Sequence, residues 1–240
     1  MRILLAGATG VIGHRLVPLL FGAGHEVGGT TRSRHKAALL EGWGVSPVIV
    51  DVRNTGASIE AVDGFKPEVI IDQVTDLPQV FDPANFDEVA RRNAATRKAA
   101  ARNLVQAAVR AGTRRVIAQS LAFAYAPGPE PHLETDPLDI GAEGGRALMV
   151  DAVATTERLV TETPGFEGIV LRYGYFYGPG TWFARPGGKP ALHVDAAASA
   201  ALLAVTRGKP GIYNIAEDDG AVSTAKARAE LGFDPSFRLA

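Results

Sequence analysis

The stretch LLAGATGVIGHRLVPLL, residues 4–20, decides the fold of this chain. It begins as a continuous apolar run, as in a buried strand, and its last ten residues carry apolar side chains at helical spacing. Three glycines, at positions 7, 10 and 13, lie at the junction of the two patterns. A glycine-rich turn that follows a strand and opens a helix is typical of a phosphate-binding turn in dinucleotide-binding folds.

Each of the three glycines has its own role in such a turn. Gly7 allows the tight turn, Gly10 lets a pyrophosphate approach the backbone, and Gly13 lets the helix pack close to the strand. The helix would offer its unpaired N–H groups and the positive end of its dipole to the phosphates. The alternative is a purely structural turn. The residues expected to bind the cofactor here are Gly7, Thr9, Gly10, Val11, Ile12 and Gly13.

Strand and helix patterns alternate along the rest of the chain. The expected strands cover residues 2–6, 25–30, 45–50, 68–72, 114–119, 168–172 and 211–215, and the expected helices cover 11–21, 34–41, 86–111, 147–163, 194–205 and 224–231. Continuously apolar strands between helices indicate a parallel sheet covered on both faces. We therefore predict a doubly wound α/β (Rossmann) fold, with a dinucleotide-binding core over residues 1–172 and a small substrate-binding region over residues 173–240, packed on the same core.

The composition excludes several classes of function. The 25 basic and 26 acidic residues give a formal net charge of -1, so no electrostatic footprint for nucleic acid or an anionic membrane is present. The chain has no cysteine, which excludes disulfides and thiolate chemistry, and its five histidines show no metal-ligand spacing. No apolar run reaches the roughly 18 residues of a membrane span. We expect a cytoplasmic protein with a small-molecule substrate and no metal, and the oligomeric state stays open.

The end of the second expected strand indicates which nucleotide is bound. NAD-binding chains usually have an acidic residue there, which binds the ribose 2′-hydroxyl. In this chain the position holds Thr31, followed by Arg32 and Arg34. A guanidinium binds a 2′-phosphate that a carboxylate would repel. We therefore predict NADP(H) as the cofactor, the alternative being two solvated arginines at the start of a helix.

Further cofactor contacts are expected at the ends of the third and fourth strands. Asp51 and Val52 come directly after the third strand, where the adenine edge would lie. Gln73, Val74 and Thr75 follow the fourth strand and are candidates for contacts with the ribose and phosphates. The alternative for Thr75 is the start of a turn, because Thr, Asp and Pro cluster in turns.

Several segments together resemble a known family. They are GATGVIG (7–13), Asp51, VIAQSLAFAY (116–125), LRYGYFYGPG (171–180), His193 to Asp195 before an alanine-rich helix, and STAKARAELGF (223–233). In this order they resemble the extended short-chain dehydrogenase/reductases, also called the NAD-dependent epimerase/dehydratase family. The resemblance implies that Tyr173 lies beside the nicotinamide and that Tyr175 faces the substrate.

The resemblance breaks at the proton-transfer machinery. The family uses a Tyr-x-x-x-Lys pair on the helix after the fifth strand, and a Ser or Thr near the end of that strand. Here Met149 and Val153 occupy the positions of the pair, and Leu121, preceded by Ser120, occupies the third position. Methionine and valine do not transfer protons, and their i, i+4 spacing is typical of helix packing. The chain is therefore predicted to be an atypical member.

Two residues are the candidates for catalysis. Ser120 would donate a hydrogen bond to a carbonyl oxygen, unless it is bonded to its own backbone. Tyr175 belongs to an alternating set with Tyr173 and Tyr177, which suits a flat, apolar substrate unless the rings are core residues. Four other aromatic residues are candidates for the pocket wall: Phe123, Phe176, Trp182 and Phe183. Tyr125 and His193 are weaker candidates, because the family has structural residues there.

These observations favour an NADP(H)-dependent ketoreductase that acts on an aromatic or polycyclic natural product without the Tyr-Lys pair. The resemblance extends to reductases that tailor aromatic polyketides in antibiotic biosynthesis, angucyclinone ketoreductases among them. The alternative is a non-catalytic NADP(H)-binding sensor, which the missing pair favours. A sugar-nucleotide epimerase or dehydratase is disfavoured because those reactions need the missing base.

Two connections are short for this fold. Only nine residues, FARPGGKPA, separate Trp182 from Leu192, and only eight, AEDDGAVS, separate Ile215 from Thr224. Either the chain is a compact variant, or mobile substrate-lid residues are missing there. The acidic cluster at residues 217–219 is interpreted as a solvated loop.

Overall fold

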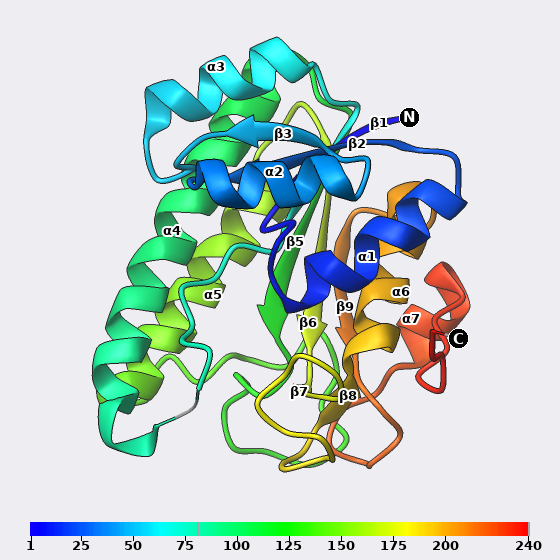
Figure 1. Cartoon of the computed structure of the whole chain (residues 1–240). Helices are drawn as coiled ribbons and strands as arrows, with labels where there is room; N and C mark the ends of the chain where they lie inside the picture. Colours follow the sequence, from blue (N-terminus) through cyan, green and yellow to red (C-terminus); the bar gives the residue numbers. More distant parts are fainter. Residues whose placement is uncertain (81, 240) are drawn as a thin grey trace.

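The computed structural model describes residues 1–80 and 82–239 (Figure 1). Seven strands form one sheet in the order β3-β2-β1-β4-β5-β6-β9, and every neighbouring pair is parallel. They are β1 (Arg2–Ala6), β2 (Glu26–Thr31), β3 (Ser46–Ile49), β4 (Val69–Asp72), β5 (Arg115–Leu121), β6 (Glu167–Tyr173) and β9 (Gly211–Ile215). The predicted doubly wound α/β fold is confirmed, with the strand order reversing between β1 and β4.

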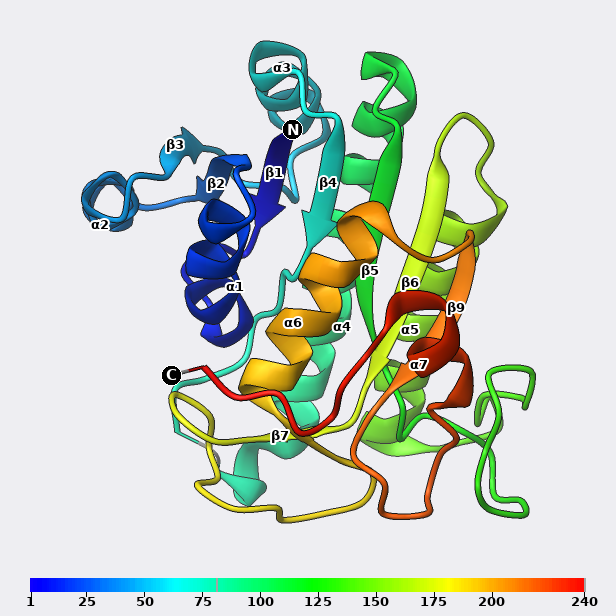
Figure 2. The same ribbon diagram turned by 90° about the vertical axis from the view of Figure 1, so that its right-hand side faces the viewer.

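Helices cover both faces of this sheet. They are α1 (Val11–Gly22), α2 (Arg34–Gly42), α3 (Thr55–Phe65), α4 (Phe86–Ala111), α5 (Gly144–Glu162), α6 (Val194–Thr206) and α7 (Ala225–Leu231), with a short 3-10 helix η1 (Pro83–Asn85) before α4. Figure 1 shows α4 and α5 on one side of the sheet and α1 and α6 on the other, and Figure 2 looks onto the α1 and α6 side.

The strands divide the core into two layers because successive side chains point to opposite faces. Leu5 and Ile71 are buried on the α1 and α6 side, whereas Leu4 and Ile70 are buried against α4. Such continuously apolar strands are expected of a parallel sheet buried on both faces. The alanines of α6 are almost all buried, and their small side chains let this helix lie close to α1 and the sheet.

Helix α3 and the second sheet were not predicted. Gly56 and Gly64 lower the helix propensity of α3, although the N-cap signal was present, since the Asn54 side chain accepts from the N–H of Ala57. The second sheet pairs β7 (Tyr175–Tyr177) with β8 (Ala191–His193) in parallel. Strands of three residues carry too little pattern to be recognised in the sequence.

All seven main strands end at the same edge of the sheet, because they are parallel. In Figure 1 this edge points downward, and the loops that follow β5, β7 and β9 gather beneath it. Ligands of open α/β sheets bind outside the carboxyl ends of the strands, at the point where the strand order reverses. The fold therefore directs the search for a site to the ends of β1 and β4 and to these loops.

A buried arginine ties the opposite edge of the sheet to α6. Arg115, at the start of β5, donates to the carbonyl oxygens of Ala204 and Arg207 at 2.7 and 2.8 Å and forms an ion pair with Glu167 at 2.7 Å. These carbonyls belong to the C-terminal end of α6, where a cation is favourable to the helix dipole. The neighbouring Arg114 pairs with the same carboxylate but is exposed.

We predict that Arg115→Met lowers the free energy of unfolding by about 3 kcal/mol or more, because several buried groups lose their partner together. Arg114→Met, the matched control, is expected to cost less than about 1 kcal/mol, as an exposed pair does. Urea denaturation of both variants measures the difference. Equal losses in the two variants would contradict this role for Arg115.

Candidate functional site

The glycine turn at the end of β1 has the geometry expected of a phosphate-binding turn. Gly7 has a φ of +86°, and a β-carbon there would lie 2.7 Å from the carbonyl oxygen of Gln73. A β-carbon at Gly13 would lie 2.4 Å from the carbonyl oxygen of Ala8. Only glycine therefore fits at either position. At Gly7 the positive φ and the end of β4 exclude a side chain, and at Gly13 the backbone of the turn before α1 excludes it.

The N-terminal end of α1 is not capped by a side chain. Gly10 is the N-cap residue, lies exposed, and donates its own N–H to the carbonyl oxygen of Gly7 at 2.9 Å. The first N–H groups of an α-helix have no partner within the helix. Those of Val11, Ile12 and Gly13 therefore remain available to an anion, as the sequence predicted for a diphosphate.

Gln73 lies at the end of β4, beside this turn. Its amide Nε2 donates to the Tyr173 hydroxyl at 3.4 Å, and that hydroxyl donates to the carbonyl oxygen of Ala197 at 3.2 Å. Its Oε1 atom is buried and has no hydrogen-bond partner among residues 1–80 and 82–239. Tyr173 is fully buried, and this burial raises the pKa of its phenol. Cofactor contacts by Gln73 and Tyr173 stay predictions, and the unpaired amide oxygen suits such a contact.

The next residues along the chain are less buried. Val74 and Thr75 are half-buried, and the N–H of Val74 donates to Asp72 at 3.0 Å. Asp76 is held by Asn93, which accepts from its N–H at 2.8 Å, and by an ion pair with Arg92 at 3.0 Å. This segment therefore leaves the end of β4 in a fixed direction beside the glycine turn.

Charged residues gather at the carboxyl ends of β2 and β3. Arg32 and Arg34 are exposed there, and Ser33 between them caps α2 by accepting from the N–H of Lys36. Asp51 receives a forked contact from Arg53, with distances of 2.7 to 3.2 Å between the guanidinium and the carboxylate.

The contact with Arg53 stabilises the charged carboxylate of Asp51. The hydrogen bond from Arg53, aided by the charge of Arg32, lowers the pKa of Asp51. Val52 is buried between them in the chain. Arg53 was not predicted as part of the site, although its position two residues after Asp51 is close enough in the sequence for the pair to be expected.

Ser120 and its neighbours form a buried polar network. The Ser120 hydroxyl is 0% exposed and donates to Oε1 of Glu157 at 2.6 Å. Glu157 in turn accepts from Nε and Nη2 of Arg172 at 2.8 and 2.7 Å. The Arg172 guanidinium also lies over the ring of Tyr125, 4.8 Å from its centre. The network joins β5, α5 and β6, and sequence reasoning did not find Glu157 or Arg172 as partners of Ser120.

The positions predicted to correspond to the family's proton-transfer residues hold apolar side chains. Val153 is fully buried in a cluster with Ala124 and Val150, and Leu121 packs against it. Met149 lies half-buried on α5. Val153 thus has the helix-packing role that its spacing indicated.

The three alternating tyrosines have different environments. Tyr173 is in the core, whereas Tyr177 donates its hydroxyl proton to Glu217 at 2.5 Å. Tyr175 is 41% exposed, and its ring stacks on Phe123 with centroids 3.8 Å apart and an angle of 10°. Burial raises the pKa of the Tyr175 phenol, so it stays protonated at neutral pH. Of the three, Tyr175 is the one with an exposed ring, and it follows β6 at the carboxyl ends of the main strands.

The loop of residues 178–190 runs between β7 and β8 and reaches from Tyr175 to the segment that follows β4. The Trp182 indole donates to the carbonyl oxygen of Pro78 at 2.9 Å, which ties the loop to the segment after β4. A β-carbon at Gly180 would lie 3.9 Å from Val11, at the start of α1. His193 caps α6 by accepting from the N–H of Asp195, as suits a structural residue. The short connection before Leu192 is thus a largely exposed loop that the Trp182 indole ties to Pro78.

The second short connection is also held in place. Glu217 accepts from Tyr177, and Asp219 accepts from the N–H of Ala191 at 2.7 Å. The interpretation of residues 217–219 as a solvated loop is therefore wrong for Glu217 and Asp219. Their distant partners could not be identified from a local acidic pattern.

Comparison with known proteins shows the family. The pattern of the NAD(P)H-binding family matches residues 7–177. The chain belongs to this NAD(P)H-binding family. A Streptomyces protein named 3-diazoavenalumate denitrifying reductase is 39% identical over 244 residues, which cover 92% of this chain and 77% of that protein. Photosystem II assembly factor Ycf39 of Cyanophora paradoxa is 35% identical over 89 residues, which cover 37% of this chain and 26% of that protein.

Solved structures support the fold. The UDP-glucose 4-epimerase of Thermotoga maritima superposes with a TM-score of 0.82 at 18% identity, covering 99% of this chain and 94% of the epimerase. The UDP-glucose 4-epimerase of Thermus thermophilus, in complex with NAD, gives 0.78 at 20% identity, covering 100% and 95%. These structures, at 18 and 20% identity, show the shared fold. The family model shows NAD(P)H binding, whereas the choice between NADP and NAD stays a prediction.

The remaining general features concern metals and membranes. Within residues 1–80 and 82–239 no group of three His, Asp or Glu side chains could hold a metal ion. In the same part of the chain, every helix is too short or too polar to span a bilayer.

Asp72 is an unusual titratable group behind the site. Its carboxyl is buried near Arg97, which donates to the carbonyl oxygen of Gln119. Burial raises the pKa of Asp72 to about 6, although the N–H of Val74 and the charge of Arg97 oppose the shift. The folded protein therefore binds this proton more tightly than the unfolded chain does.

We predict that Asp72 makes the protein less stable as the pH rises. Its contribution is complete below about pH 4 and is lost as the pH rises through about 6, a change of about 3 kcal/mol. Asp72→Asn, which resembles the protonated form, should gain about this much relative to the parent protein between pH 4 and 7. Urea denaturation across this range measures the difference, and a constant gap between the two proteins would refute it.

Proposed function

We propose that this chain is an NADP(H)-dependent oxidoreductase that transfers a hydride to a flat aromatic substrate without a Tyr-Lys pair. The proposal is supported by the closed glycine turn at Gly7 and Gly13 and by the apolar residues Leu121, Met149 and Val153, which we infer to replace the family's proton-transfer residues. The reductase relative, at 39% identity over most of both chains, supports an enzyme of this kind.

The residues present fit a dinucleotide. The turn leaves no room for a β-carbon at Gly7 or Gly13, the start of α1 has no side-chain cap, and the buried Gln73 Oε1 lacks a partner in the described part of the chain. The N–H groups at the start of α1 would hold the diphosphate, and Asp51 and Val52 the adenine. When bound, the nicotinamide supplies the hydride.

The choice of NADP(H) rests on charge. The end of β2 has no carboxylate to bind a 2′-hydroxyl, and Arg32 and Arg34 are exposed beside it. Guanidinium groups bind a phosphate through charge-assisted hydrogen bonds. Arg53 adds a third guanidinium at the end of β3, although Asp51 already engages it.

We predict that Arg32→Ala weakens NADPH binding about 10- to 100-fold, the loss of one or two charge-assisted hydrogen bonds. NADH, which lacks the 2′-phosphate, should bind within about twofold of its original affinity. Arg158→Ala, an exposed arginine on α5, is the control for net charge. Isothermal titration calorimetry gives all the constants, and a parallel loss for both cofactors would exclude 2′-phosphate recognition by Arg32.

The name of the Streptomyces relative suggests which group accepts the hydride. It describes the reduction of a diazo compound with removal of nitrogen. An arenediazonium ion accepts a hydride at its terminal nitrogen to give an aryldiazene, which loses N₂ while the ring carbon gains the hydrogen. No alkoxide forms, so the acceptor does not need the acid that the Tyr-Lys pair would supply. A diazo-substituted aromatic compound is therefore the substrate class that best fits the apolar positions.

The site would contribute orientation and exclusion of water. The stacked rings of Phe123 and Tyr175 offer a flat apolar surface on which a substrate ring can lie. The cluster of Val153, Ala124 and Leu121 excludes water from the end of β5. Holding the reacting groups face to face provides much of the rate enhancement that such a reaction needs.

An aromatic ketone, such as a polyketide, is the second candidate. The Tyr175 phenol supports it, because a phenol is protonated at neutral pH and this side chain is exposed enough to reach a developing alkoxide. Ser120 has less to offer in this role, since its hydroxyl is buried and donates to Glu157.

We predict that Tyr175→Phe separates the two candidates. With NADPH and a stable arenediazonium salt, its turnover should stay within about threefold of the parent protein. With NADPH and α-tetralone, any turnover should fall about 100-fold, the usual contribution of a general acid. Reactions without enzyme provide the baseline.

The overall outcome also tests the proposal as a whole. Nitrogen release that depends on both enzyme and NADPH supports the diazo substrate. NADPH binding without turnover of either compound class would instead indicate the sensor that the sequence left open.

A further inference from the structure

The segment of residues 234–239 crosses from α7 to the start of α6. The carboxylate of Asp234 accepts from Ser236 at 2.7 and 2.8 Å and so forms a local turn. Phe237 packs against the apolar core, and the N–H of Leu239 donates to Asp195 at 3.2 Å. Contacts at both ends therefore fix the segment on the body of the protein.

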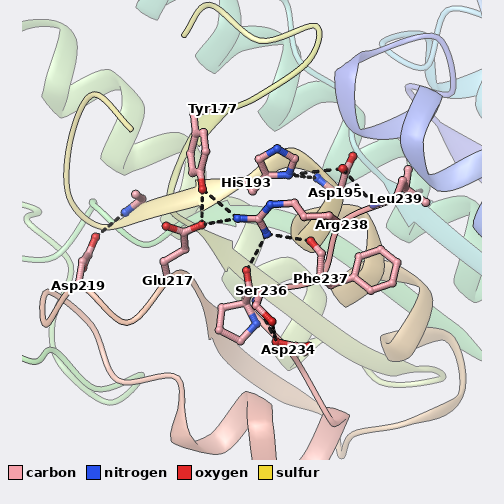
Figure 3. Close-up of polar contacts among 12 residues, drawn as sticks. Tyr177, His193, Asp195, Glu217, Asp219, Asp234, Ser236, Phe237, Arg238 and Leu239 are labelled. Atoms are coloured by element: carbon pink, nitrogen blue, oxygen red, sulfur yellow. Dashed lines mark hydrogen bonds and ion pairs between the residues drawn. The ribbon is translucent and has the colours of Figure 1, made fainter. Parts of the chain in front are cut away.

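Arg238 leaves this segment towards β7, as Figure 3 shows. Its Nη2 atom donates to the Tyr177 hydroxyl at 3.0 Å and to Oε1 of Glu217 at 3.1 Å. The Tyr177 hydroxyl donates to the same carboxylate oxygen at 2.5 Å. The three groups form a closed triangle in which each side chain contacts the other two.

The triangle lies at the base of the loop of residues 178–190. Tyr177 is the last residue of β7, where the loop begins, and Ala191 is the first residue of β8, where it ends. At the end of the loop, the N–H of Ala191 donates to Asp219, and the carbonyl oxygen of Ala191 accepts from the N–H of Glu217 at 2.8 Å. Glu217 and Asp219 thus hold both ends of the loop, and Arg238 stabilises the end at Tyr177.

The loop reaches both halves of the candidate site. Its Gly180 lies near the dinucleotide turn, since a β-carbon there would be 3.9 Å from Val11, and its Trp182 donates to Pro78 after β4. Gly188 lies against the Tyr175 ring, where a β-carbon would be only 3.2 Å from Cδ2. A shift of the loop base would therefore change the space beside Tyr175 and the distance between the loop and the glycine turn.

We propose that Arg238 and Glu217 are positioning residues of this site, which act through Tyr177 to set the loop of residues 178–190 and Tyr175 against a bound aromatic ring. Arg238 and Glu217 are partly exposed, so their ion pair adds little to global stability. Its effect lies in the position of the loop. The role in substrate binding rests on the proposed function, whereas the role in holding the loop does not.

The structure provides a matched control. Arg228 on α7 pairs with Asp218, the residue between Glu217 and Asp219, and has a similar exposure to Arg238. It contacts neither β7 nor the loop among its described partners. Arg228→Met therefore removes an equivalent ion pair from the same acidic segment without touching Tyr177.

The first experiment needs no ligand. Chymotrypsin cleavage after Trp182 and Phe183 is followed in the parent protein and in the Arg238→Met, Arg238→Lys and Arg228→Met variants. We expect cleavage about tenfold faster in Arg238→Met, equivalent to about 1.4 kcal/mol of easier loop opening. Arg238→Lys should restore part of the protection, and Arg228→Met should match the parent protein. Tyr177→Phe removes the hydroxyl from the triangle and should behave like Arg238→Met.

The second experiment measures kinetics with NADPH and an arenediazonium salt. In Arg238→Met the KM for the diazonium should rise about tenfold, while the dissociation constant of NADPH and the midpoint of thermal unfolding stay close to those of the parent protein. The emission of Trp182, isolated in a Trp43→Phe background, should shift when the diazonium binds to the parent protein but less in Arg238→Met.

The outcomes separate the two proposals. Equal cleavage of Arg238→Met and Arg228→Met would overturn the positioning role, whatever the kinetics show. The positioning role would also be overturned if Arg238→Met lowered thermal stability and impaired NADPH binding and turnover together with KM, as the loss of a merely structural contact would. Faster cleavage in Arg238→Met with no NADPH binding in the parent protein would support the loop-holding role and refute the proposed function.

Discussion

The absence of room for a β-carbon at Gly13 is the constraint on which the site depends. Because the backbone of α1 can lie against Ala8 and Gly7, the first turn of the helix comes directly after β1 and points its N–H groups past the edge of the sheet. Gly7 meets the same limit on its other side, against Gln73 at the end of β4. The turn, the helix start and the neighbouring strand end are thus fixed relative to one another before any ligand binds.

The parallel sheet extends this constraint to the rest of the site. Since every main strand ends at one edge, Phe123 after β5, Tyr175 after β6 and Glu217 after β9 lie in successive loops at that edge. The stack of Phe123 on Tyr175 and the bond from Tyr177 to Glu217 then link these loops across the sheet. Residues far apart in the sequence come together because the strands share a direction.

The sequence was informative where the determining contacts are local. The glycine turn, the strand alternation and the missing carboxylate at Thr31 depend on neighbours within a few residues, and the predicted fold was correct. The bond from Ser120 to Glu157 spans 37 residues and that from Arg238 to Tyr177 spans 61, so neither leaves a local pattern. Glu217 and Asp219 likewise have partners, Tyr177 and Ala191, that are distant in the sequence and leave no local pattern. Long-range polar contacts require the register of the sheet, which the sequence pattern does not specify.

The apolar residues at the positions proposed for the proton-transfer pair have a consequence for chemistry that does not depend on the substrate's identity. A tyrosine and a lysine at positions 149 and 153 would need water or hydrogen-bond partners, whereas Val153 is fully buried among Ala124, Val150 and Leu121. Introducing a lysine there would bury a charge among apolar side chains, at a cost of several kcal/mol. If position 153 corresponds to the family's lysine, as we propose, the packed cluster makes its restoration by a single substitution costly. Such a site favours a substrate that accepts a hydride without a proton. Otherwise a proton donor must come from another part of the chain, and the exposed, protonated phenol of Tyr175 fits that role.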